Sequence, residues 1–134
     1  KKQTLADWRR NNINKIMEEQ RLIEVIAEAI QDKKGKGVVS LDLSGMDGAI
    51  CSHFVVCHAD STTQVDAISQ GIEEKVFEVM HEWPTRVEGR QNSFWIAMDY
   101  GDVIVHIFQS ELRDYYRLEE LWADAPMKRY EFGE

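Results

Sequence analysis

The chain has 134 residues, and its 16 basic and 24 acidic side chains give a net charge of −8 at pH 7. This length suits one domain that buries a single core without metal or disulfide support. The negative balance disfavours general attraction to nucleic-acid phosphates or anionic membranes and favours a basic protein partner. Two cysteines are too few for a disulfide framework, which predicts reduced thiols in a cytoplasmic protein. Neither a membrane span nor a signal peptide is predicted, and the start on Lys1 suggests a trimmed chain.

Helical signals dominate the first third of the chain. Thr4 and Asp7 have the spacing of a capping box, which favours a helix within the polar residues 1–20. Further on, Ile23, Ile26 and Ile30 recur at helical spacing before a Lys-Lys-Gly stop. The sequence therefore predicts helical structure up to about residue 32, as either one long helix or two.

Two strands and a second helix are predicted next. The β-branched and apolar residues at 38–43 and 54–57 indicate strands. Ser61 is a helix cap to which the Gln64 side chain is expected to reach back. Apolar residues then follow at steps of three or four up to Val79. Pro84 requires this helix to end by about His81, after which 85–88 forms a short strand.

The segment Phe94 to Phe108 predicts a β-hairpin with its turn at residues 99–102. Its second arm is apolar on both sides except at His106, which is typical of a central strand. Short helical turns are predicted at 110–116 and 118–122, and the tail at 123–134 has no strand or helix period. The fold class is therefore α/β (α+β), with a mixed sheet of about five strands flanked by helices.

Asp99 and Asp102 form one candidate site, because carboxylates at a strand end hold magnesium in phosphate-transferring enzymes. The alternative is that both are turn residues whose side chains bond to the local backbone. Gly101 lies between them and no third acidic ligand is near in sequence, which favours the turn.

Histidines offer two further candidates. His106 in the central strand can act as a base or a pH-sensitive contact, but spacing pairs it with no nucleophile. A hydrogen-bonded interior histidine or a contact residue is therefore favoured. His53, Cys57 and His58 suggest a metal site, yet His58 points away from the other two on a strand and a fourth ligand is missing. Structural packing is the favoured explanation there.

An aromatic and charged patch follows the hairpin. Tyr115, Tyr116 and Trp122 are interleaved with Arg113 and Glu119, and aromatic residues with arginine are enriched at the centres of protein interfaces. The alternative for each aromatic is simple core packing. Adjacent tyrosines lie about 100° apart on a helix, so both are not expected to be fully buried. Glycine-rich phosphate-binding loops are absent from the sequence.

Two consecutive segments of the chain closely resemble the ribosomal silencing factor family, also called RsfS or Iojap. They read W-I-A-M-D-Y-G-D-V-I-V-H-I-F at 95–108 and R-D-Y-Y-R-L-E-E-L-W-A-D-A at 113–125. Upstream, L-D-L at 41–43 and F-V-V-C at 54–57 fall in the family's order, so the resemblance covers about 22–125. Ala59, Thr63 and Ser93 depart from the glycine, arginine and glycine that are usual there.

The resemblance implies a nucleotidyltransferase-like sheet without that superfamily's catalytic signature, hence no enzyme activity, no cofactor and no metal. It implies an N-terminal extension at 1–20, a silencing-factor domain at 21–125 and a C-terminal tail at 126–134. It also implies binding to the fourteenth protein of the large ribosomal subunit, which blocks subunit joining and lowers translation under nutrient limitation. Direct nucleic-acid binding and membrane binding are not expected.

The expected contact surface combines hairpin and patch residues. They are Trp95, Asp99, Tyr100, Asp102, His106, Arg113, Tyr115, Tyr116 and Glu119. Aromatic members would anchor the partner and acidic ones would receive its basic groups, while Arg113 would either contact the partner or brace the patch internally. Two alternatives stay open: a magnesium-dependent nucleotidyltransferase-like enzyme using Asp99 and Asp102, and a homodimer of the free protein through the same aromatic patch.

Overall fold

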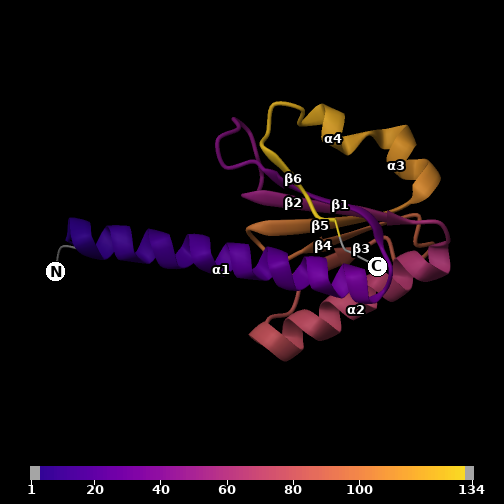
Figure 1. Cartoon of the computed structure of the whole chain (residues 1–134), viewed down its shortest axis with the longest axis horizontal. Helices are drawn as coiled ribbons and strands as arrows, with labels where there is room; N and C mark the ends of the chain where they lie inside the picture. Colours follow the sequence, from indigo (N-terminus) through magenta and orange to yellow (C-terminus); the bar gives the residue numbers. More distant parts are fainter. Residues whose placement is uncertain (1–3, 132–134) are drawn as a thin grey trace.

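A computed structural model describes residues 4–131 and shows one mixed sheet between two layers of helices (Figure 1). The strand order is β3-β4-β5-β2-β1-β6. In chain order, the helices and strands are α1 (Leu5–Asp32), β1 (Lys36–Asp42), β2 (His53–Ala59), α2 (Thr62–Met80), β3 (Arg86–Glu88), β4 (Trp95–Asp99), β5 (Val103–Gln109), α3 (Ser110–Tyr116), α4 (Leu118–Leu121) and β6 (Met127–Arg129). Helices α1 and α2 cover the inner face of the sheet, and α3 and α4 lie on the outer face.

The N-terminal helical signals belong to a single continuous helix. Thr4 caps α1, and its hydroxyl accepts a hydrogen bond from the Asp7 amide at 3.1 Å. Buried residues begin only at Leu22, so the second half of α1 packs on the sheet while the first half extends beyond it (Figure 1). Of the two arrangements that the sequence allowed, the structure has the single long helix.

Helix α2 begins and ends where the sequence predicted. The Ser61 hydroxyl accepts from the Gln64 amide at 3.1 Å, and the helix stops at His81, which has a left-handed backbone. The expected return bond from the Gln64 side chain is wrong. That amide instead donates to the carbonyl oxygens of Lys33 and Lys34, at 3.2 and 3.1 Å. Because the end of α1 offers unpaired carbonyls nearby, a tertiary bond replaces the local one.

The predicted hairpin and central strand are confirmed. Strands β4 and β5 pair antiparallel, with Asp99 opposite Ile104, and β5 pairs in parallel with β2 on its other side. Side chains alternate between faces, so Val103, Val105 and Ile107 enter the inner core while Ile104 and Phe108 pack in the outer one. Both faces of β5 are thereby covered, which explains its nearly continuous apolar sequence.

The tail contradicts the expectation that it has no strand. Residues Met127–Arg129 form β6 and pair antiparallel with β1, with Ser40 opposite Lys128. This raises the sheet from about five strands to six. All three β6 residues are exposed at the sheet edge, so the strand lacks the alternation that marks a half-buried one. Among the described residues, no helix is long and apolar enough to cross a membrane.

Candidate functional site

The outer surface of the sheet carries a connected group of aromatic rings, called here the aromatic face. It consists of Trp95, His106, Phe108, Tyr115 and Tyr116. The Trp95 ring stacks on Phe108 with centroids 4.8 Å apart and meets Tyr116 at 5.0 Å. Tyr115 stands edge-on to Tyr116 at 5.1 Å. Phe108 is fully buried, whereas Tyr115 is 78% exposed and Tyr116 is 50% exposed, so this face has a rigid floor and an open rim.

His106 is an interior member of this face and is held by a hydrogen bond. The indole Nε1 of Trp95 donates to its Nδ1 at 3.0 Å, which places the imidazole proton on Nε2. Phe54 approaches the same ring edge-on at 4.6 Å. Burial lowers the pKa of His106 to about 4, so the ring is neutral at physiological pH. A hydrogen-bonded interior histidine therefore describes it better than a general base does.

Arg113 and Glu119 hold α3 and α4 against the sheet. The guanidinium Nε lies 3.4 Å from a Glu119 carboxylate oxygen, while Nη1 donates to the Gly37 carbonyl at 2.6 Å. Nη1 also lies 2.7 Å from Nδ1 of His58, whose pKa is lowered first by burial and then by the arginine charge. Since the Arg113 side chain is only 11% exposed, its geometry matches the internal brace.

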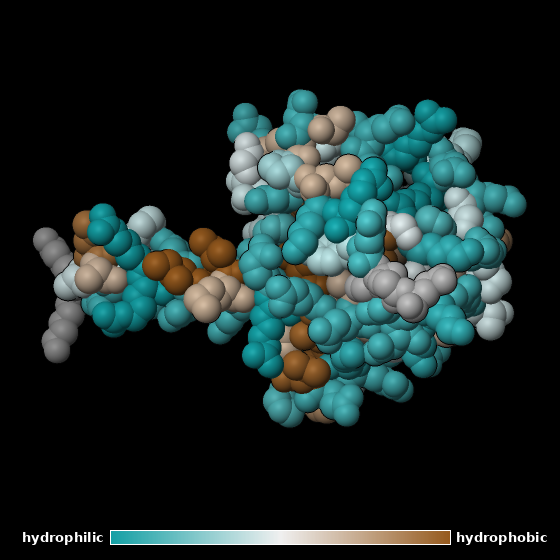
Figure 2. All heavy atoms as spheres, in the orientation of Figure 1, coloured by the Kyte–Doolittle hydropathy of each residue, from teal (hydrophilic) through white to brown (hydrophobic). Residues whose placement is uncertain are grey.

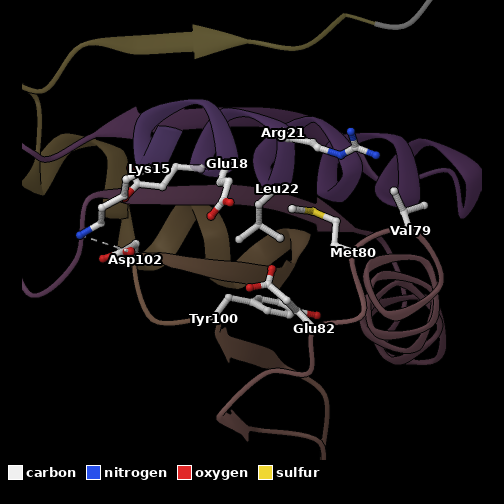
Figure 3. Close-up of a pocket in the computed structure, with 10 residues that line it drawn as sticks. Lys15, Glu18, Arg21, Leu22, Val79, Met80, Glu82, Tyr100 and Asp102 are labelled. Atoms are coloured by element: carbon white, nitrogen blue, oxygen red, sulfur yellow. Dashed lines mark ion pairs between the residues drawn. The ribbon is translucent and has the colours of Figure 1, made fainter. Parts of the chain in front are cut away.

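The hairpin tip lies apart from the aromatic face. Tyr100 packs against the inner core, where it lines a groove with Leu22, Met80 and Glu82 (Figure 3). Burial raises the pKa of its phenol, and the hydroxyl has no hydrogen-bond partner among the described residues. Asp102 pairs with Lys15 of α1 at 3.9 Å, drawn as a dashed line in Figure 3. The predicted site residues therefore fall into two separate groups.

Asp99 behaves as the turn residue that the sequence favoured. Its Oδ1 accepts a hydrogen bond from the Gly101 amide at 2.7 Å, and Gly101 has a φ of 92°, which suits glycine. The carboxylate is thus engaged in local backbone support. No cluster of three or more metal-ligating side chains occurs within residues 4–131.

Sequence reasoning did not identify the two buried rings that shape the aromatic face. Phe54 on β2 contacts both His106 and Trp122, and Phe108 forms the floor under Trp95. The alternation in β5 offers a signal, because Phe108 shares its side with His106. Cys57 lies in the inner core, where burial raises the pKa of its thiol to about 12 and leaves it unreactive.

The chain is similar in sequence and in fold to known proteins of one family. A family model described as "Ribosomal silencing factor during starvation" matches residues 16–133. A ribosomal silencing factor of Bacillus subtilis is 34% identical over 87% of this chain and 98% of its own length. Another, of Halalkalibacterium halodurans, is 39% identical over 82% of this chain and 92% of its own length. A crystal structure of a Chromobacterium violaceum protein superposes with a TM-score of 0.73 at 33% identity, over 78% of this chain and 85% of that one.

Proposed function

Because the chain belongs to the ribosomal silencing factor family, we propose that it binds the large ribosomal subunit in the cytoplasm and represses translation when nutrients are scarce. The contact is with the fourteenth protein of that subunit, on the surface where the small subunit docks. Occupation of that surface prevents the two subunits from joining. The protein acts by binding, without a catalytic step.

The exposed rim of the aromatic face is the observation that carries this proposal. Tyr115 and Tyr116 present large amphipathic rings on a floor that Trp95 and Phe108 hold in place. Rigid tyrosines of this kind supply binding energy at a small entropic cost and are enriched at interface centres. The net charge of −8 favours encounter with a basic ribosomal protein.

Contact roles differ among the sequence-predicted residues. We assign anchoring of the partner to Trp95, Tyr115 and Tyr116. Arg113 and Glu119 keep α3 and α4 in position, and His106 orients the Trp95 indole. Asp99, Tyr100 and Asp102 lie at the hairpin tip, where the two carboxylates would receive basic groups at the margin of the contact.

Co-sedimentation with purified large subunits tests this proposal. The Tyr115→Ala/Tyr116→Ala variant removes two exposed rings and leaves the core intact, and we expect at least a tenfold loss of affinity, roughly 1.4 kcal/mol. Trp83→Ala is the matched control, because Trp83 is also an exposed aromatic residue but follows α2 and stacks on Phe77 at 4.3 Å. Unchanged binding of the tyrosine variant, or an equal loss in the control, refutes the assignment of the site.

The alternative of a magnesium-dependent nucleotidyltransferase-like enzyme requires Asp99 and Asp102 to hold the metal. Their present bonds, to the Gly101 amide and to Lys15, make them less available for that role. Titration calorimetry with nucleotide and magnesium separates the two functions. Heat of binding that disappears in Asp99→Asn/Asp102→Asn would favour the enzyme, whereas the silencing function predicts no heat.

A further inference from the structure

The groove at the hairpin tip lies on the inner side of the sheet, apart from the aromatic face (Figure 3). It has a volume of about 450 Å³ and is bounded by α1, the end of α2 and the hairpin turn. Leu22, Val79, Met80 and the ring of Tyr100 form its apolar floor. Val79 is 39% exposed, and Figure 2 shows apolar side chains uncovered at the lower edge of the body, where α2 ends in Figure 1. The groove therefore exposes apolar surface that no other described element covers.

Carboxylates predominate on the walls of this groove. Four acidic residues face two basic ones there, which gives the groove a net charge of −2; they are Glu18, Glu19, Glu82 and Asp102, with Lys15 and Arg21. Lys15 is already paired with Asp102 at 3.9 Å, and the Arg21 side chain points away from Glu18 (Figure 3). Within residues 4–131, Glu18 and Glu82 form no ion pair. Two walls of the groove thus carry carboxylates without a cationic partner.

The titration of Glu19 reflects the same excess of negative charge. Burial, and next the charge of Asp102, raise the pKa of Glu19 above its ordinary value. His53 and Lys15 act in the opposite direction without offsetting this rise. The basic groups that the chain supplies here therefore leave the carboxylates incompletely compensated, so a further cation would be stabilised in the groove.

A long basic side chain combines the two properties that this groove requires. The aliphatic stem of lysine or arginine lies readily on apolar surface while the charged head stays among polar groups. Figure 3 shows the Glu18 carboxylate entering the groove from α1 and the Glu82 carboxylate entering beside the Tyr100 ring, with Leu22 between them. A cationic head at this position donates charge-assisted hydrogen bonds to both carboxylates, and its stem covers the floor.

Other classes of occupant fit the groove less well. A purely apolar segment would desolvate the carboxylates without giving them a partner, which is costly. An anion would meet a net charge of the same sign. A metal ion requires converging ligands, and residues 4–131 contain no group of three or more side chains that could hold one. Charge and shape together therefore select an aliphatic cation.

We propose that this groove docks a basic segment of a partner protein, with one lysine or arginine side chain lying on the apolar floor and bonded to Glu18 and Glu82. The volume of about 450 Å³ suits one long side chain and a short extended backbone, whereas a helix of about 10 Å diameter would not enter. Neither Glu18 nor Glu82 belongs to the surface proposed for ribosome binding. The groove is therefore a second contact, which does not depend on that function.

Fluorescence anisotropy of the full chain with a labelled decapeptide of alternating lysine and serine tests this docking site. We expect a dissociation constant between about 10 µM and about 1 mM that rises with salt, because opposite charges contribute. The same peptide with acetylated lysines keeps the aliphatic stems but loses the charge, so it should bind at least about tenfold more weakly. For the lysine peptide, Glu18→Gln/Glu82→Gln should raise the dissociation constant at least about fivefold.

The matched control is Glu24→Gln/Glu74→Gln, which changes the net charge of the chain by the same amount. Glu24 on α1 and Glu74 on α2 are exposed, do not line this groove and form no ion pair within residues 4–131. This variant should bind the lysine peptide within about twofold of the wild type. Circular dichroism checks that both variants are folded.

Methyl nuclear magnetic resonance spectra locate the bound peptide. The largest shifts are expected at Leu22, Val79 and Met80, which form the floor of the groove. The Tyr115→Ala/Tyr116→Ala variant should bind the peptide as the wild type does, because its changes lie on the aromatic face. A failure of the ribosome-binding proposal is thereby distinguished from a failure of this one.

Several results overturn the proposal. Equal weakening in the control variant would mean that the peptide responds to net charge alone, and shifts confined to other methyl groups would place it elsewhere. Unchanged affinity for the acetylated peptide would show that no cation is recognised. Spermidine that shifts the groove methyl groups at concentrations where the peptide does not would identify a free polyamine as the occupant. Dimers that dissociate in Glu18→Gln/Glu82→Gln would identify a second copy of the chain instead.

Discussion

Replacing His106 by glutamine should remove a defined part of the acid sensitivity of the fold. The folded histidine has a pKa of about 4 because it is buried, whereas an unfolded one titrates near 6.5. Between these values the unfolded state binds more protons, so the free energy of unfolding rises with pH. The stability that neutral His106 preserves is present above about pH 6.5 and is lost progressively as the pH falls toward about 4.

The magnitude follows from the two pKa values. The full difference corresponds to about 3 kcal/mol, and at pH 5 the wild-type chain should already have lost about 2 kcal/mol through this residue. Glutamine cannot titrate, and its carbonyl oxygen still offers an acceptor for the Trp95 indole, which donates to His106 at 3.0 Å. The His106→Gln variant therefore isolates titration from loss of the hydrogen bond.

Urea unfolding at pH 7.5 and at pH 5, followed by far-ultraviolet circular dichroism, measures the effect. The change in unfolding free energy between the two pH values should be about 2 kcal/mol larger for the wild type than for His106→Gln. Glu19 and His58, whose pKa values are also shifted, are present in both proteins and cancel in this difference. An identical pH dependence of the two proteins would show that His106 is accessible to protons in the folded state.

Two further stability measurements test the packing beside the aromatic face. Trp95→Phe keeps a ring on Phe108 but leaves the buried Nδ1 of His106 without its hydrogen-bond donor. Urea unfolding at pH 7.5 should therefore show a free energy of unfolding lower by about 1–3 kcal/mol. An unchanged free energy of unfolding would mean that water replaces the indole as the donor. Gly89→Ala should destabilise by clearly more than the roughly 1 kcal/mol expected for Gly101→Ala. Both glycines have positive φ, but only a Cβ at 89 meets the Trp95 carbonyl, so equal losses would contradict the clash.

Local patterns predicted the hairpin, the central strand and both ends of α2, because each rests on nearby residues. The sequence shows directly that β5 is apolar on both sides and that the turn before it contains a glycine. Local patterns do not predict β6, because its Met-Lys-Arg sequence has no apolar alternation and the strand forms only by pairing with β1. The Gln64 side chain likewise bonds to the distant end of α1, which no local rule anticipates.

Strand alternation, which can be read from the sequence, separates two members of the predicted contact surface. Trp95 begins β4, and Tyr100 directly follows the last residue of that strand, five positions later. In extended backbone, side chains an odd number of positions apart point to opposite faces. The structure follows this rule, with Trp95 in the outer cluster and Tyr100 against the inner one. Grouping them as one contact surface relied on closeness in sequence. Exposure of Tyr115 and Tyr116, by contrast, followed correctly from helical geometry.

The two faces of the sheet also separate the proposed contact residues from one another. Trp95 and Tyr116 belong to the outer face, whereas Tyr100 packs against the inner core and Asp102 pairs with Lys15 of α1. If the exposed tyrosines anchor the partner and the hairpin tip lies at the margin of the contact, the two groups should contribute independently to the affinity for large subunits. Strongly coupled losses in a double-mutant cycle between them would mean that they form one surface, contrary to the separation that strand alternation imposes.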